Sequence, residues 1–295
     1  MNKDKLTRWL VSGPPLVFML VFFVAPALIM VLVSFRYPGE YGGLAPLGPG
    51  EPGWGLTAET YRFFFSDYIY AEIFLKSLCV AALTTLICIA MAYPLALLIT
   101  RVPRRFRDAM ILLVVLPFAS NFLVRVYAWM IILGPQNAFS LLVNRALGLF
   151  GAEPVALLFS PFAVIVGMVY VHLPFMVLPL YTNLDKHDPT LLDAAQDLGA
   201  NAWQRFAQIT WPMSLPGVFA GSALVFIPVL GMFAIPDILG GTSDILIGNL
   251  IKEQFLGTRD WPFGSTLSIM LTFVVLLVAG VAALYARTGA RYAAN

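Results

Sequence analysis

Long apolar stretches alternate with short polar segments along this chain. A hydrocarbon core of about 30 Å requires roughly 20 helical residues, and a backbone inside lipid must satisfy its own hydrogen bonds. Six stretches meet that length, with only Arg125 interrupting the third; they lie at about 10–35, 77–100, 109–133, 157–182, 214–237 and 262–286. The pattern therefore predicts an all-α membrane protein with six transmembrane helices, in one domain over residues 1–295.

The composition agrees with this prediction. Hydrophobic residues make up 60% of the chain and charged residues only 12%. A soluble domain has about 25% charged residues, so too few charges are present to cover a water-facing surface. The net charge of +2 gives no reason to expect a nucleic-acid partner. Cys79 and Cys88 lie nine residues apart, on opposite helix faces, and are predicted to be buried free thiols.

The first apolar stretch follows Lys3, Lys5 and Arg8, as a secretory signal would. It is longer than the roughly 7–15 apolar residues of a signal peptide, so we expect a retained signal anchor. Lysine and arginine favour the cytoplasmic side of a membrane. The segment RVPRRFR at 101–107 is short and lies close to two predicted spans, where that rule is strongest.

A cytoplasmic N-terminus places eleven basic residues inside: Lys3, Lys5, Arg8, Arg101, Arg104, Arg105, Arg107, Lys186, Arg205, Arg287 and Arg291. Six then lie outside: Arg36, Arg62, Lys76, Arg145, Lys252 and Arg259. Both termini are therefore predicted to be cytoplasmic. On the outside, we expect an irregular Gly- and Pro-rich loop over 36–71, a short interfacial helix within 134–153, and a short amphipathic helix within 240–260.

One polar segment has strong helix signals, a predicted cytoplasmic hairpin at 188–212. Asp188-Pro189 is a helix start, and Gly199 is placed to end that helix in a left-handed conformation. Asn201 followed by Gln204 predicts a second N-terminal cap. Pro212 and Pro216 are predicted to end the second helix before the fifth span.

Small residues shape the first helix of this hairpin. Ala194 and Ala195 would let another surface approach closely, and Gly199 with Ala200 keeps the turn thin. Trp203, Phe206 and Ile209 follow at spacings of three and form one apolar stripe. Physical signals alone leave a plain cytoplasmic loop equally acceptable.

The spacing of the hairpin resembles the EAA motif of membrane permeases of ABC importers. That pattern is Glu-Ala-Ala, three residues, Gly, nine residues, Ile, two residues and Pro. Here Asp193-Ala194-Ala195 is followed by Gly199, Ile209 and Pro212, with Asp193 in place of the usual Glu as the one departure.

The resemblance implies a type I ABC importer permease whose hairpin couples to a separate ATPase. The implied coupling residues are Asp193, Ala194, Ala195, Gly199, Ala200, Phe206, Ile209 and Pro212. No lysine of this chain follows a glycine, so the chain lacks the phosphate-binding loop of an ATPase and is not expected to be an enzyme.

Three further stretches resemble spermidine/putrescine permeases, of the first permease subunit type: LPFASNFLVRVYAW at 116–129, LPFMVLPLY at 173–181 and LIGNLIKEQFLGTRDWPFGS at 246–265. The resemblance covers most of the chain from the second span onward. It implies a bacterial inner-membrane location and three kinds of partner: a second permease, an ATPase dimer and a periplasmic polyamine-binding protein. It implies no cofactor and no metal.

Polyamines are flexible polycations, so their pathway should offer carboxylates and aromatic faces. Asp237, near the outer end of the fifth span, is the main candidate, and an interfacial helix-capping role is equally open. Asn121, Arg125 and Trp129 would share one face of the third span, with Tyr127 nearby. An aromatic belt at the interface explains Tyr127 and Trp129 nearly as well. Arg125 would pair with a carboxylate such as Asp237 or extend to the interface.

Other functions remain to be compared. The same machine could carry another amine, an amino-acid derivative or a metal ion. A secondary transporter would show inverted repeats, and none is evident. An intramembrane enzyme would need a pair of histidines or carboxylates within the spans; the chain has two isolated histidines, and His172 is expected to be a packing residue.

Overall fold

The computed structural model describes residues 3–48, 55–241 and 244–292. Within these ranges the chain is helical, and the only β pairing there consists of isolated bridges. The chain divides into two compact units: Met1–Glu72 with Leu250–Val274, and Ile73–Asn249 with Val275–Asn295. The single domain over 1–295 stays a prediction.

The first span begins the first unit. It comprises α1 (Lys3–Met19), a π-helical turn η1 (Leu20–Val24) and α2 (Ala25–Ser34), and it matches the predicted stretch at 10–35. The following loop is irregular, as predicted, with antiparallel bridges between Arg36 and Leu56 and between Pro38 and Leu44.

The loop after the first span ends earlier than predicted, in two helices. These are α3 (Glu59–Ser66) and α4 (Tyr68–Arg101). Asp67 starts α4 by accepting a hydrogen bond from the Ile69 amide at 3.0 Å. The second span was predicted at 77–100 because charges were excluded, and Glu72 and Lys76 lie within the longer helix.

The last helix of the chain is α14 (Trp261–Tyr292), which contains the predicted span at 262–286. Asp260 caps its start, since its carboxylate accepts from the Phe263 amide at 3.0 Å. Phe263 packs against Phe63 and Tyr70, with ring centroids 5.3 Å and 5.2 Å away. These aromatic contacts and the bond between the Thr266 and Thr60 hydroxyls, at 3.1 Å, hold the first unit together.

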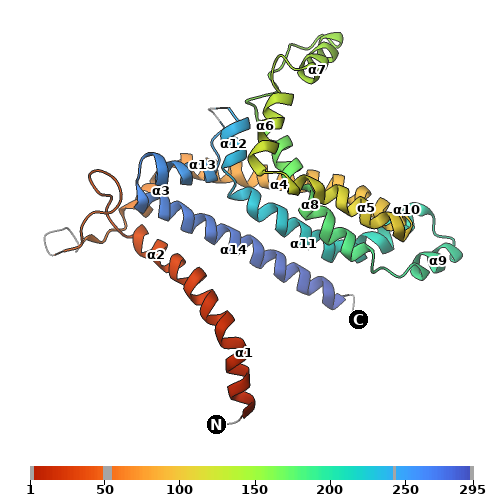
Figure 1. The fold of residues 1–295 in the computed structure, drawn as a ribbon, viewed down its shortest axis with the longest axis horizontal. Coiled ribbons are helices and arrows are strands. Elements are labelled where there is room, and N and C mark those ends of the chain that lie inside the picture. Colours follow the sequence, from red (N-terminus) through yellow and green to blue (C-terminus); the bar gives the residue numbers. More distant parts are fainter. Residues whose placement is uncertain (1–2, 49–54, 242–243, 293–295) are drawn as a thin grey trace. The chain divides into compact units, whose positions relative to one another are not determined.

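The second unit is built on α8 (Pro161–Leu184) and α11 (Trp211–Leu230), which lie side by side (Figure 1). Their close approach depends on glycine. A Cβ atom on Gly217 would lie 2.7 Å from Asn183 Cβ, and one on Gly221 would lie 2.6 Å from Met176 Sδ. Because glycine has no side chain, the two helix backbones can approach closely here, as in other membrane helix pairs.

The substitution Gly217→Ala should push α8 and α11 apart, because the added methyl meets the Asn183 Cβ and the Pro179 carbonyl oxygen, which are not flexible. We expect a loss of about 1–3 kcal/mol of stability, the usual range for overpacking. The thermal midpoint of the purified protein measures this. The control is Gly280→Ala in α14, where a Cβ meets nothing within 4 Å; an equal loss in both variants would contradict the packing argument.

The third span is not one helix, which corrects the prediction at 109–133. It consists of α5 (Arg104–Val115), the 3₁₀ turn η3 (Leu116–Ala119) and α6 (Phe122–Ile132), with a bend of 91°. Two residues between α5 and α6 cause this bend. Pro117 lacks an amide hydrogen and so cannot continue the hydrogen bonding of α5, and Asn121 starts α6 by accepting from the Leu123 amide at 2.8 Å. Among the described residues, the bent pair and five long apolar helices give up to six spans.

The fifth span also ends earlier than predicted. Helix α11 stops at Leu230 rather than at about 237, and a separate helix α12 (Ala234–Leu239) follows. Pro236 lies in the first turn of α12, where a missing amide hydrogen is tolerated. Helix α12 packs against α6 and α8.

Two segments between the spans carry the short helices that the sequence predicts. In the first, α7 (Ala138–Leu149) begins at Asn137, whose side chain accepts from the Phe139 amide at 3.0 Å. In the second, α13 (Ile247–Lys252) continues into the π-helical turn η5 (Glu253–Gly257).

Candidate functional site

The polar hairpin lies at one end of α8 and α11 (Figure 1). Its first helix is α9 (Thr190–Asp197). Asp188 accepts a hydrogen bond from the Thr190 amide at 3.0 Å. That bond, together with one from the Thr190 hydroxyl, lowers the pKa of the Asp188 carboxyl from its ordinary value. The cap predicted from Asp188-Pro189 is therefore present and ionised at neutral pH.

The end of α9 has the geometry expected of a glycine stop. The Ala200 amide donates to the Ala195 carbonyl, and the Gly199 amide donates to the Gln196 carbonyl, each at 2.9 Å. These two bonds form a Schellman motif, which requires a left-handed residue at its centre. Gly199 supplies it with φ of +84°. The glycine in the motif is therefore required by the backbone.

The second arm starts with the predicted capping box. The backbone amide of Gln204 donates to the Asn201 side-chain oxygen at 2.9 Å, and the backbone amide of Asn201 donates to the Gln204 side-chain oxygen at 2.8 Å. This arm is α10 (Ala202–Arg205). Arg205 donates to the Gln196 side chain at 2.6 Å, which joins the two arms.

Pro212 and Pro216 do not end the second arm, which corrects that prediction. Helix α10 continues through the π-helical turn η4 (Phe206–Thr210) directly into α11. The Trp211 amide bonds the Phe206 carbonyl, and the wider turn brings Pro212 to the first turn of α11, where no amide hydrogen is needed. The hairpin is thus the start of a transmembrane helix, and force on it acts directly on α11.

The tip of the hairpin exposes apolar side chains. Leu198 is 88% exposed and Trp203 is 72% exposed. Of the predicted coupling residues, Asp193, Ala194, Gly199 and Pro212 are exposed and Ala195, Ala200, Phe206 and Ile209 are half-buried. An exposed apolar tip beside small residues is typical of a surface that docks into a partner. The coupling role of these eight residues stays a prediction.

The base of the hairpin is tied to the α4–α5 junction by Arg107. Its guanidinium forms an ion pair with Asp185, at the end of α8. It also donates to the carbonyl oxygens of Thr100 at 2.5 Å and Val102 at 2.9 Å. One side chain therefore holds the ends of α4 and α8 together, where the hairpin begins.

A second contact ties α4 to α11 through buried hydroxyl groups. The hydroxyls of Tyr93 and Ser214 lie 2.8 Å apart, and Ser214 donates to the Trp211 carbonyl at 2.8 Å. Because serine has one hydroxyl hydrogen, Tyr93 is the donor of the pair. The Tyr93 ring also meets Phe206 and Trp211, with centroids 5.6 Å and 5.4 Å away.

Because Tyr93 donates and Ser214 accepts, two substitutions should lower the free energy of unfolding by unequal amounts. Ser214→Ala leaves the buried Tyr93 hydroxyl without its acceptor and should cost about 1–3 kcal/mol. Tyr93→Phe removes the donor and leaves only an unused lone pair on Ser214, at about 0.5–1.5 kcal/mol. Thermal midpoints of the two purified variants compare these costs. A larger loss for Tyr93→Phe would show that the donor is assigned wrongly.

Asp237 lies in α12, at the opposite end of α8 and α11 from the hairpin (Figure 1). Its side chain is exposed and accepts a hydrogen bond from Asn249, which also donates to the Phe233 carbonyl at 3.1 Å. Asn249 also accepts from the Leu246 amide at 3.3 Å. Asn249 thus positions Asp237, a role that sequence reasoning missed although the residue lies in the family-like stretch.

The other predicted pathway residues have separate roles. Asn121 is the N-cap of α6 rather than part of its face, since its side chain bonds the backbone. Arg125 lies over the Phe118 ring at 4.9 Å, and its Nε and Nη1 have no hydrogen-bond partner within the described residues. Trp129 packs edge-on against Tyr170 at 5.6 Å, and Tyr127 is 47% exposed. The pathway role of Asn121, Arg125, Tyr127, Trp129 and Asp237 stays a prediction.

Comparison with known proteins decides the family. A scan of family models finds no match. The spermidine/putrescine transport system permease protein PotB of Haemophilus influenzae is 40% identical over 260 residues, which cover 88% of this chain and 87% of that protein. PotB of Escherichia coli is 44% identical over 214 residues, covering 72% of this chain and 76% of that protein. The chain belongs to the PotB permease family.

Solved structures confirm the fold of this PotB-type permease. A chain of a bacterial alginate ABC transporter, in complex with an alginate-bound periplasmic protein, matches with a TM-score of 0.69 at 20% identity. The match covers 95% of this chain and 94% of the other. A chain of the MetNI methionine ABC transporter matches with a TM-score of 0.54 over 74% of this chain and 95% of its own length. The predicted all-α ABC permease fold is confirmed.

Family membership and apolar helices together establish a multi-pass inner-membrane protein. The relatives are transport permeases and not enzymes. Within the described residues, no three His, Cys, Asp or Glu side chains form a metal-binding group. His172 is buried and bonds the Met168 carbonyl at 2.8 Å, as a packing residue should. Cys88 is buried but Cys79 is exposed, which corrects its predicted burial.

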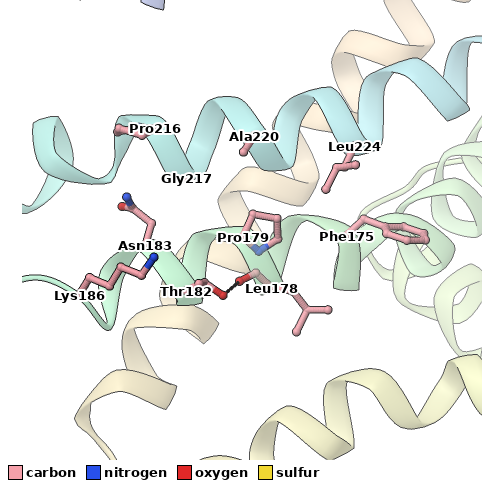
Figure 2. Close-up of a pocket in the computed structure, with 10 residues that line it drawn as sticks. All are labelled: Phe175, Leu178, Pro179, Thr182, Asn183, Lys186, Pro216, Gly217, Ala220 and Leu224. Carbon is pink, nitrogen blue, oxygen red and sulfur yellow. Dashed lines mark hydrogen bonds between the residues drawn. The ribbon is translucent and has the colours of Figure 1, made fainter. Parts of the chain in front are cut away.

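The PotB-type permease also has a groove along α8 and α11, with a volume of about 490 Å³ (Figure 2). Figure 2 shows Asn183 and Lys186 at its polar end and Phe175 toward the other end. Gly217 and Ala220 line it from α11. The small residues that let the two helices meet thus also leave this mostly apolar groove beside them, which we call the furrow.

Proposed function

We propose that this permease is a membrane subunit of an ATP-driven importer for the polyamines spermidine and putrescine. The observation that carries the proposal is the 40% identity to a spermidine/putrescine permease over 88% of the chain. The match also covers 87% of that relative.

The proposed coupling element is the hairpin of α9, α10 and η4. The EAA spacing, the exposed Leu198 and Trp203, and the Schellman stop at Gly199 support docking into a separate ATPase subunit. The continuous run from α10 into α11 supports direct transmission to the membrane. ATP hydrolysis would take place in that ATPase, since this chain has no phosphate-binding loop.

The complex is proposed to contain a second permease, an ATPase dimer and a periplasmic polyamine-binding protein. The hairpin and both termini would lie in the cytoplasm, as the distribution of lysine and arginine favours. The furrow along α8 and α11 offers an apolar face to the second permease. Asp237 would then lie at the outer end, where the binding protein delivers cargo.

The cargo chemistry suits the outer end. An ammonium group is attracted by a carboxylate and by the face of an aromatic ring. Asp237 is exposed and fixed by Asn249, and the half-exposed Tyr127 lies on α6, which packs against α12. Transport would proceed by alternating access, in which ATP binding and hydrolysis change the relative stability of outward-open and inward-open states.

The test is uptake of radiolabelled spermidine and putrescine by cells that lack their own polyamine permease genes. The gene for this chain is restored together with those of its transport partners. Restored uptake of either amine is the expected result. Absence of uptake of both, with the protein inserted and assembled, would discard the polyamine cargo and leave another small solute as the substrate.

A further inference from the structure

A second cavity lies at the base of the hairpin and is separate from the furrow of Figure 2. Its volume is about 510 Å³. It is enclosed by the end of α4, the start of α5, the end of α8, the first residues of the first hairpin arm and the second arm as far as the start of α11. Four arginines line it: Arg101, Arg104, Arg107 and Arg205. We call this cavity the arginine pocket.

The positive charge of the arginine pocket is only partly neutralised. Arg107 is bound by Asp185 and by backbone carbonyls, and Arg205 is bound by Gln196. Asp188 is the other acid in the lining, and its carboxylate is held by Thr190.

The remaining two arginines differ from these. Arg101 and Arg104 are both exposed, and among the described residues neither guanidinium has a hydrogen bond or an ion pair. Two guanidinium groups facing one cavity repel each other unless an anion lies between them. The pocket therefore has an excess of positive charge that the described part of the chain does not balance.

The pocket lies near the ends of two candidate membrane spans. Arg101 is the last residue of the span Tyr68–Arg101, and Thr210 and Met213 belong to the span Ala202–Leu230. Its walls are thus apolar on the membrane side, through Leu97 and Met213, and basic on the water side. With these two spans in a bilayer, an anion in the pocket would lie at the depth of the phospholipid headgroups.

We propose that the arginine pocket binds a phosphate group. The planar guanidinium donates two parallel hydrogen bonds, which match the oxygens of a phosphate. A phosphate held by Arg101 and Arg104 would also lie beside Arg205 of the hairpin. It would brace the hairpin against the α4–α5 junction, and so affect how motion passes from the hairpin to α11. The phosphate can come from an anionic phospholipid or from solution.

The experiment is isothermal titration of the complete purified transporter complex with short-chain phosphatidylglycerol and, separately, with inorganic phosphate. Wild type should bind at least one of them. The variant Arg101→Gln/Arg104→Gln should bind it about tenfold more weakly or worse, the effect of losing charge-assisted bonds. The matched control is Arg105→Gln/Arg145→Gln, which removes the same charge from exposed residues that do not line the pocket.

The outcomes are distinct. Binding of phosphatidylglycerol alone assigns the site to a lipid headgroup, and binding of inorganic phosphate as well assigns it to a soluble anion; both support the proposal. No binding to wild type, or equal weakening in both double variants, would overturn it. Should the glutamine variant fail to assemble, Arg101→Lys/Arg104→Lys keeps the charge and loses the paired donors, and unchanged binding there would overturn it as well. Because binding is measured without transport, failure here leaves the proposed cargo untouched.

Discussion

Gly199→Val should strongly reduce polyamine uptake while leaving the protein inserted in the membrane. Gly199 has φ of +84° at the centre of the Schellman stop, a conformation that β-branched residues avoid. The left-handed conformation costs roughly 1–2 kcal/mol for an L-residue, and relief of that strain would unwind the end of α9. We expect uptake to fall at least about tenfold, measured beside the amount of membrane-inserted protein.

Gly151→Val is the matched control. Gly151 also has a left-handed backbone, with φ of +74°, and a Cβ there meets nothing within 4 Å, as at Gly199. It follows α7, away from the hairpin, so the same strain should leave uptake near wild type. Normal uptake by Gly199→Val, or an equal loss in both variants, would show that the hairpin is not the coupling element.

Asp237→Asn should lower polyamine uptake by raising the concentration needed for half-maximal transport. The substitution keeps the size of the side chain and removes its negative charge, so the attraction for a polycation is lost while the fold is kept. A charge-assisted contact is worth about 1.5–3 kcal/mol, so we expect roughly a tenfold or greater rise in that concentration. Initial rates of spermidine uptake over a concentration series measure it.

Asp244→Asn is the control for Asp237→Asn. Asp244 is another acid of the same unit, and it forms an ion pair with Lys76 at 2.9 Å. Its loss should leave the half-maximal concentration within about twofold of wild type, since a partly exposed pair contributes little. A larger effect at Asp244 than at Asp237 would move the cargo contact to the loop before α13.

The hairpin could be predicted closely from sequence because its signals are local. The Asp188 cap, the Gly199 stop and the Asn201–Gln204 box each depend on residues within five positions of one another. The continuous passage into α11 could not be predicted this way. Proline usually ends a helix, and the π-helical turn that accommodates Pro212 has no sequence pattern of its own.

The membrane spans likewise combine features that the sequence predicted with features that it did not predict. Apolar length located all six stretches, but the 91° bend of the third depends on η3 and the Asn121 cap, which interrupt an apolar run without adding charge. Contacts between distant segments were missed for a different reason. The pairs Tyr93–Ser214 and Arg107–Asp185 join residues 121 and 78 positions apart, and a single sequence does not show which helices become neighbours.

The most direct test of the account is to measure ATP hydrolysis and spermidine uptake in the same proteoliposomes, with the complete transporter and its binding protein. The account predicts that wild type hydrolyses ATP and accumulates spermidine together, and that Gly199→Val loses accumulation while Gly151→Val retains both. Accumulation of spermidine by Gly199→Val at the wild-type rate per ATP hydrolysed would contradict the claim that the hairpin couples hydrolysis to transport.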